Sequence, residues 1–245
     1  MSMQLAQFLF SGLTLGAAYT LAALGFSMIY NASGIINFAQ GEFIMVGGMA
    51  AAALATHGVS LPLACLGGVA IAAAIGIAVE RLAIAPTRKA ETTSIIIVTI
   101  GVSMVLRGMT EILLGKQNHA LAAFSGDTPL ELAGASILPQ SLWVMGVSAA
   151  IVAALALFFG RTRFGKAMLA TAYNRLAAQL CGVDVRKVMM SSFALSAAIG
   201  AVGGGTLTPI TTVAYDTGIM LGLKGFVAAT LGGLGSGVGA VFGGL

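Results

Sequence analysis

Charged residues are scarce in this chain of 245 residues. Only 8% of them are Asp, Glu, Lys or Arg, while 58% are hydrophobic and the mean hydropathy is +0.99. Soluble domains carry roughly 25% charged residues, so this composition excludes the polar surface that a soluble protein needs. The sequence predicts a single all-α, polytopic integral membrane domain over residues 1–245, with about seven hydrophobic segments.

Cysteine, histidine and proline are also scarce. The two cysteines, Cys65 and Cys181, exclude a disulfide framework, and we expect both to be reduced and structural. The two histidines, His57 and His119, fall far apart on predicted external loops, so the sequence predicts no metal site. It also shows no Ser/His/Asp triad and no paired carboxylates. We therefore expect no catalytic residues, no cofactor and no enzymatic activity in this chain.

Long apolar runs dominate what remains. No Lys or Arg precedes Arg81, so the first run lacks the basic start of a signal peptide and should be retained as a span. Most of the runs are long enough to cross a bilayer as helices, but the second, with 13 residues, is short for a full span. The expected spans are residues 8–30, 43–55, 61–79, 94–114, 141–159, 188–209 and 219–245.

Polar residues interrupt the apolar pattern at residues 31–42, the sequence NASGIINFAQGE. Bare backbone is tolerated at membrane depth only where protein buries it or a cavity is lined by it. This stretch is therefore either a short interfacial loop or a broken helix whose polar groups face a pathway. In the first case Glu42 lies at the water interface as a helix-start acid. In the second, Asn37, Gln40 and Glu42 are candidate pathway residues, because polar groups inside spans tend to be functional.

Two charged residues lie within the predicted span 94–114. Arg107 and Glu111 are four residues apart, on one face of a helix, and can pair with each other. Both fall in the last third of the span. The simplest interpretation is that they reach the interface by snorkelling.

The last segment is rich in glycine. The sequence GGLGSGVG at residues 232–239 would make a weak helix, so we expect a break or a tight packing surface there. The chain then stops within an apolar run without a basic anchor. We expect that it is truncated at its C-terminus.

Basic residues predict the orientation. The segments 81–89 and 161–187 hold nine of the twelve Lys and Arg residues, and two predicted spans separate them. Both segments should therefore lie on one side, which the positive-inside rule makes cytoplasmic. Three spans precede the first of them, so the N-terminus should be external. The connection 115–140, with Asp127 and Glu131 against Lys116, should be an external loop.

The basic segment 161–187 contains a predicted amphipathic helix between Gly165 and Gly182. Ala and Leu dominate it and favour a helix. Gly182 is placed to cap it in a left-handed conformation, and Asp184 is placed to start the next helix. One apolar stripe is expected at helical spacing, formed by Met168, Ala172, Leu176 and either Leu180 or Cys181. This helix either rests on anionic lipid or docks into a groove of a soluble subunit.

Three stretches resemble the permease subunits of branched-chain amino acid ABC importers, of the high-affinity H type. They are GLTLGAAYTLAALGF (12–26) followed by INFAQGE (36–42), RFGKAM (163–168) leading to GVD (182–184), and LGGLGS (231–236) with GAVFGG (239–244). In this family the segment 161–187 corresponds to a cytoplasmic coupling loop. The resemblance implies contact with an ATPase by Ala170, Asn174, Ala177, Ala178 and Gly182. Asn174 stands where many relatives carry an acidic residue.

The resemblance also implies a function and partners. We expect the membrane-spanning subunit of an ATP-driven importer in the bacterial inner membrane, which moves branched-chain amino acids or a related small polar solute into the cytoplasm. The expected partners are two ATP-binding subunits, a second homologous permease, a solute-binding protein, the solute and the lipid bilayer, with no nucleic acid. Two alternatives stay open: a urea or amide importer permease of the same family, and a secondary transporter or channel that works alone.

Overall fold

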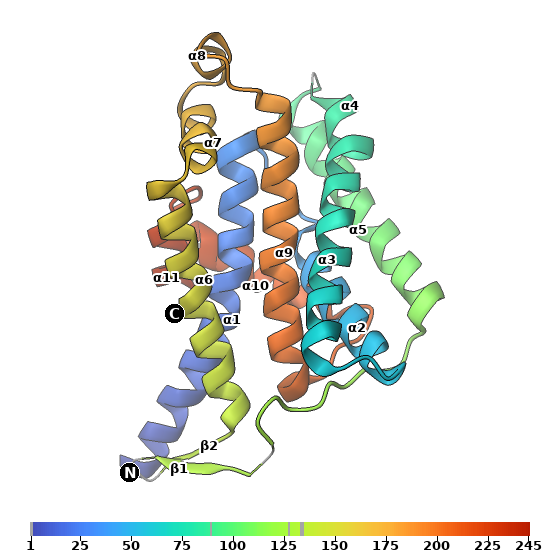
Figure 1. Cartoon of the computed structure of the whole chain (residues 1–245), viewed down its shortest axis with the longest axis vertical. Helices are drawn as coiled ribbons and strands as arrows, with labels where there is room; N and C mark the ends of the chain where they lie inside the picture. Colours follow the sequence, from blue (N-terminus) through green and yellow to red (C-terminus); the bar gives the residue numbers. More distant parts are fainter. Residues whose placement is uncertain (1, 89, 127, 133–134) are drawn as a thin grey trace.

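The computed structural model describes residues 2–88, 90–126, 128–132 and 135–245. Lys89 and Asp127, which belong to the predicted charge pattern, lie outside the described residues. The fold is a helical bundle with one small hairpin (Figure 1). The elements are α1 (Ser2–Ser33), α2 (Gln40–Thr56), α3 (Leu61–Val79), a π-helical turn (Glu80–Ile84), α4 (Ala85–Thr87), α5 (Thr92–Leu114), β1 (Leu130–Leu132), β2 (Ala135–Ile137), α6 (Pro139–Arg161), α7 (Arg163–Tyr173), α8 (Arg175–Leu180), α9 (Val185–Thr211), α10 (Thr217–Leu231) and α11 (Gly237–Gly244).

Five of the described helical segments are long and apolar enough to cross a membrane. They are Gln4–Ser33, Leu61–Thr87, Thr92–Leu114, Pro139–Arg161 and Val185–Thr211. Helices α2, α10 and α11 are shorter, with 17, 15 and 8 residues. The prediction of an all-α, polytopic membrane protein is confirmed.

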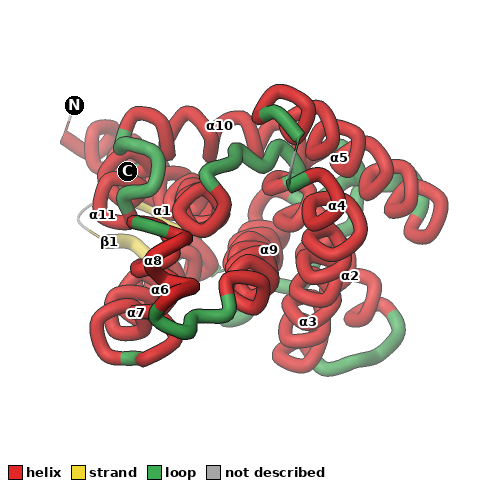
Figure 2. The backbone as a smooth tube through the Cα atoms, turned by 90° about the horizontal axis from the view of Figure 1, so that it is seen from above, coloured by secondary structure: helices red, strands yellow, loops and turns green. Residues whose placement is uncertain are grey.

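Helix α9 lies at the centre of the bundle, with α1 on one side and α2 and α3 on the other (Figure 2). The approach is close because small residues line it. A Cβ atom on Gly204 of α9 would lie 2.0 Å from the carbonyl oxygen of Ile44, and one on Gly47 of α2 would lie 2.3 Å from Cα of Ala201. Membrane helices gain stability from such backbone approach, since lipid supplies no hydrophobic force between them.

The structure corrects the predicted end of the third span. The span was predicted to end at residue 79, but the helix continues through the π-helical turn into α4, as one apolar segment Leu61–Thr87. Glu80 is fully buried and forms an ion pair with Arg88. The predicted span stopped before Glu80 because this residue is charged, and its pairing with Arg88 accommodates that charge within the continuing helix.

The glycine-rich end forms two helices rather than one span. Between α10 and α11 the chain turns at Gly233 and Gly235, both with φ near +90°, a region that side chains disfavour. The glycines also allow close packing, because a Cβ atom on Gly232 would lie 1.8 Å from the carbonyl oxygen of Gly239. The predicted break and the predicted tight surface therefore occur together.

The two ends of the bundle differ. Helices α4, α7 and α8 gather at one end, and the N-terminus and the hairpin β1–β2 lie at the other (Figure 1). The predicted loop 115–140 contains this antiparallel hairpin. Gln7 of α1 fastens it, because the Gln7 side chain exchanges two hydrogen bonds of 2.9 Å with the backbone of Ser136. The described residues of the basic segments 81–89 and 161–187 approach the end formed by α4, α7 and α8, as the count of spans between them predicted (Figure 1).

Candidate functional site

The polar stretch 31–42 forms a buried break between two helices. Helix α1 ends at Ser33 and α2 begins at Gln40, and the chain between them is not helical. Asn37, Gln40 and Glu42 have exposed fractions of 1%, 0% and 1%. The stretch is therefore a buried break rather than an interfacial loop. The interpretation of Glu42 as a residue at the water interface is wrong, although it does lie in the first turn of α2, where a helix dipole favours a carboxylate.

Asn37 organises the turn that leads into α2. Its side-chain oxygen accepts a hydrogen bond of 3.1 Å from the backbone N–H of Ala39, and its backbone oxygen accepts one of 3.1 Å from Gln40. This is the short-range bonding with which asparagine favours turns over helix. Phe38 is held as well, because its N–H donates to Thr99 Oγ1 of α5 at 3.3 Å.

Gln40 joins three helices. Its side-chain oxygen accepts from Ser196 Oγ of α9 at 2.6 Å, and its Nε2 donates to the carbonyl oxygen of Ser196 at 3.3 Å. Gly25 of α1 makes room for this amide, since a Cβ atom there would lie 2.0 Å from Gln40 Nε2. Both polar atoms of the amide have partners, so Gln40 fixes the start of α2 against α1 and α9.

Glu42 is the acid of a buried ion pair with Arg107. Glu42 Oε1 accepts from Arg107 Nη2 at 3.0 Å and from Ser103 Oγ at 2.7 Å. The predicted pair of Arg107 with Glu111 is wrong, because Glu111 pairs instead with Lys116 at 3.0 Å. The snorkelling interpretation also fails for Arg107, because its guanidinium points to Glu42 inside the bundle rather than to the interface. Helical spacing can predict only partners on the same helix. The partner of Arg107 is Glu42, which lies 65 residues earlier in the sequence, on α2.

Three polar atoms around this break have no hydrogen-bond partner among the described residues. They are Asn37 Nδ2, Glu42 Oε2 and Arg107 Nε, all buried. Glu42 Oε2 faces α10, where a Cβ atom on Gly218 would lie 2.5 Å from it. Unpaired polar atoms at membrane depth carry a free-energy cost of several kcal/mol each. The cluster therefore retains bonding capacity that the fold itself does not use.

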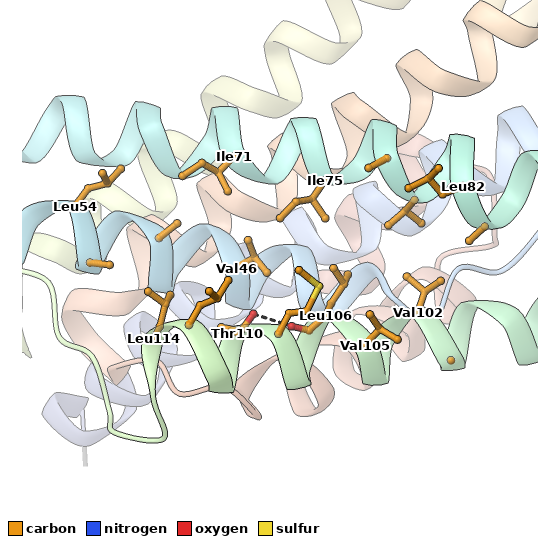
Figure 3. Close-up of a pocket in the computed structure, with 18 of the residues that line it drawn as sticks. Val46, Leu54, Ile71, Ile75, Leu82, Val102, Val105, Leu106, Thr110 and Leu114 are labelled. Carbon is orange, nitrogen blue, oxygen red and sulfur yellow. Dashed lines mark hydrogen bonds between the residues drawn. The ribbon is translucent and has the colours of Figure 1, made fainter.

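A cavity of about 780 Å³ lies beside this cluster, between α2, α3 and α5 (Figure 3). Aliphatic side chains such as Ile75, Val105 and Leu114 line it. Thr110 is one of its two polar residues, and its hydroxyl is already bonded to the carbonyl oxygen of Leu106 at 2.8 Å (Figure 3). Such walls suit hydrocarbon rather than a polar solute.

The second candidate region is the helical projection formed by α7 and α8. The predicted single helix is wrong, because the chain breaks at Asn174, where φ is −154° and ψ is 104°. Asn174 caps α8, with its side-chain oxygen accepting from the N–H of Ala177 at 3.0 Å. The predicted apolar stripe is divided as a result. Met168 packs into the bundle core, whereas Leu176 and Leu180 are exposed.

Both predicted caps of this region are confirmed. Gly182 has φ of +83°, and its N–H and that of Val183 donate to the carbonyl oxygens of Gln179 and Ala178, both at 2.9 Å, which closes a Schellman motif. Asp184 accepts from the N–H groups of Arg186 and Lys187 at 3.1 and 3.2 Å and starts α9.

Four of the five predicted coupling residues are at the surface. Ala170, Asn174, Ala177 and Gly182 are exposed, whereas Ala178 is buried, with an exposed fraction of 3%. Three large side chains nearby are also exposed, Tyr173 by 90%, Leu176 by 67% and Leu180 by 82%. The projection therefore presents apolar side chains at the basic end of the bundle.

Comparison with known proteins identifies the family. A family model described as "branched-chain amino acid transport system / permease component" matches residues 8–245. The chain belongs to this permease family. It is 35% identical to the high-affinity branched-chain amino acid transport system permease protein LivH of Escherichia coli K12, over 98% of this chain and 82% of that protein.

Two further relatives agree. The permease is 31% identical to the high-affinity branched-chain amino acid transport system permease protein BraD of Pseudomonas aeruginosa, over 98% of this chain and 82% of that protein. It is 30% identical to the probable branched-chain amino acid transport permease protein LivH of Methanocaldococcus jannaschii, over 91% and 73%. With its apolar helices, the permease is a multi-pass inner-membrane protein, as predicted.

Arg175, which no pattern in the sequence singled out, connects the two candidate regions of the permease. This first residue of α8 donates from Nη2 to the carbonyl oxygen of Ala32, in the last turn of α1, at 2.9 Å. A cation is favoured at this helix end. Burial lowers the pKa of Arg175 from its ordinary value, and the nearby Arg88 lowers it further. The projection is thus attached directly to the helix that precedes the buried break.

Proposed function

We propose that the permease is the membrane-spanning subunit of an ATP-driven importer, which moves branched-chain amino acids into the cytoplasm. The observation that carries this proposal is the exposed α7–α8 projection, with Tyr173, Leu176 and Leu180 unpartnered at the basic end. Exposed apolar side chains on a short helix are suited to a groove in another protein. The relatives named for branched-chain amino acid transport support the choice of solute.

The proposed assembly contains two ATP-binding subunits, a second homologous permease and a solute-binding protein. ATP is hydrolysed in the ATP-binding subunits, and the groove of one of them receives α8. Ala170, Asn174, Ala177 and Gly182 form the contact surface. Ala178 lies on the buried face of α8 and would not touch that subunit directly.

In this mechanism, movement of the ATP-binding subunits moves α8. The bond between Arg175 and Ala32 carries this motion to the end of α1. The break after α1 holds the proposed pathway residues, Asn37, Gln40 and Glu42. Their burial between spans and the unpaired atoms of Asn37 and Glu42 support this role. Gln40, whose amide nitrogen and oxygen both bond to Ser196, would act by positioning α2 rather than by meeting the solute.

The proposed orientation places the α7–α8 end in the cytoplasm and the N-terminus outside. Nine of the twelve basic residues fall in the two segments that approach this end, and cytoplasmic loops of membrane proteins are rich in Lys and Arg. The hairpin β1–β2 would then lie outside, on the side from which a solute-binding protein delivers its ligand.

Co-purification with matched variants tests the docking of α8. Ala177→Glu places a bulky acid on the exposed face of α8, and Ala122→Glu makes the same change at an exposed position of the opposite end. We expect Ala177→Glu to lose the ATP-binding subunits and Ala122→Glu to retain them. Full recovery of those subunits with Ala177→Glu would refute docking through α8, and their absence from the wild-type complex would favour a transporter that works alone.

A further inference from the structure

A lysine lies halfway along the bundle on its outer surface. Lys224 is in the apolar helix α10, and its Nζ donates to Tyr19 Oη of α1 at 3.0 Å. Tyr19 lies 14 residues before the end of α1 and 17 after its start. At 1.5 Å per residue, the pair is about 21 Å and about 26 Å from the two ends of this helix. Figure 1 likewise places α10 at mid-height.

The surroundings of this lysine are apolar. Lys224 and Tyr19 line an open surface pocket of about 540 Å³, and its remaining walls come mainly from aliphatic side chains. Met220, Leu223 and Val227 are among them, and all three are exposed. A charge at this depth is unfavourable against lipid, and such charges in membrane proteins usually face a pathway or a partner.

No carboxylate among the described residues pairs with Lys224. The four ion pairs among the described residues have Arg88, Arg107, Lys116 and Lys187 as their basic members. The phenol of Tyr19 receives the bond from Lys224 and keeps its own O–H free to donate. The pocket therefore offers two convergent donors, one of them charged, beside an aliphatic wall.

We propose that Lys224 and Tyr19 form a subsite for the carboxylate of the transported amino acid, whose aliphatic side chain rests on Leu223 and Val227. This inference builds on the proposed function and adds a chemical criterion to it. An ammonium with a hydroxyl donor favours an anionic oxygen, because charge-assisted hydrogen bonds are the stronger ones. The subsite thus selects amino acids over urea and simple amides, which carry no carboxylate.

A second copy of this chain does not offer an equivalent partner for Lys224. Of the described acids, Glu42, Glu80, Glu111 and Asp184 are already paired. The others lie at helix starts or in the hairpin, away from the middle of any helix, and they are Glu91, Glu131 and Asp216. A small carboxylate that binds in this pocket supplies a negative charge beside Lys224 and requires no acidic residue from another subunit.

Binding of two matched probes to the purified transporter complex tests the subsite. The probes are 4-methylpentanoate and 4-methylpentanamide, which share an aliphatic group and differ in the carboxylate. Saturation-transfer NMR should show the carboxylate bound more tightly than the amide. Lys224→Met should weaken its binding about tenfold or more, and Tyr19→Phe about threefold, as loss of a charged and a neutral hydrogen bond predicts. Lys224→Arg should retain most of the binding.

Lys116→Met is the matched control, because Lys116 lies at the far end of the bundle and is well exposed. It should leave probe binding unchanged. Carboxylate binding that is indifferent to Lys224→Met in an intact complex would overturn the inference. Loss of the second permease from the Lys224→Met complex would also overturn it, because Lys224 would then be the counter-ion of that subunit.

ATP-driven leucine uptake by the same complexes separates this inference from the proposed function. Wild-type uptake that Lys224→Met leaves intact would refute the subsite alone. Carboxylate binding through Lys224 without any ATP-driven leucine uptake in the wild type would refute the proposed function alone. Uptake that falls at least tenfold in Lys224→Met, and recovers in Lys224→Arg, is the result that we expect.

Discussion

The buried pair of Glu42 and Arg107 predicts an asymmetry between two mutations. Arg107→Met would leave the Glu42 carboxylate buried without its counter-charge, and breaking a buried pair this way costs about 3 to 5 kcal/mol. A quarter of the Arg107 side chain is exposed, so we expect a value near the lower limit, about 3 kcal/mol. Glu42→Gln should cost less, about 1 to 2 kcal/mol, since a glutamine still accepts from Ser103 and the guanidinium can turn toward its exposed side.

The double variant measures the coupling between the two side chains. With neither charge present, Glu42→Gln/Arg107→Met should lose about 1 to 2 kcal/mol less than the sum of the single variants. Unfolding of the purified permease in mixed detergent–SDS micelles, followed by far-UV circular dichroism, gives these free energies. The exposed pair of Glu111 and Lys116 is the control, and breaking it should change stability by less than about 1 kcal/mol. Additive single effects, or a smaller loss for Arg107→Met than for Glu42→Gln, would refute the reasoning.

Three further predictions concern other contacts. Gly218→Ala should lower the free energy of unfolding by about 1 to 3 kcal/mol, because the new methyl group meets Glu42 Oε2. Gly108→Ala, which meets nothing within 4 Å, should not destabilise in the same SDS titration, and equal losses would contradict the packing argument. Asn174→Ala should destabilise α8 by about 1 kcal/mol through loss of its cap, seen as faster amide exchange in α8, whereas Asn174→Asp should keep the protection. The pKa of Asp184 is lowered from its ordinary value of 3.8, mainly by the hydrogen bond from the backbone N–H of Lys187. Amide protection at the start of α9 should therefore be complete above pH 3.8 and be lost as the pH falls through the lower pKa of the folded state. Asp184→Asn should remove this pH dependence, and an unchanged profile would show that Asp184 is not its source.

Patterns that act along the chain predicted the class and several local features. Apolar runs predicted the long spans, and the glycine-rich stretch predicted the break before α11. Gly182 and Asp184 predicted the two caps that follow α8. Each of these depends on a residue and its near neighbours in sequence. The number of spans between segments 81–89 and 161–187 also predicted that they share one end. That count depends only on the apolar runs and requires no knowledge of how the helices pack.

Contacts between distant helices were not accessible in the same way. Arg107 was assigned to Glu111 because helical spacing brings them together, yet its partner is Glu42 on another helix. The predicted span 61–79 stops before Glu80 because this residue is charged, yet Glu80 is buried within the continuing helix and paired with Arg88. Asn174 breaks the helix that the Ala-rich composition favours, since its side chain bonds the backbone of Ala177. In all three cases a specific polar partner overrides a local preference.

ATP-driven uptake is the most direct test of the proposed function. The permease would be reconstituted into proteoliposomes with its ATP-binding subunits, its second permease and its solute-binding protein, and radiolabelled leucine would be supplied on the side of the binding protein. We expect accumulation of leucine that requires ATP on the opposite side and that Ala177→Glu abolishes. Accumulation without ATP, or uptake that is unchanged by Ala177→Glu, would contradict an importer driven through α8.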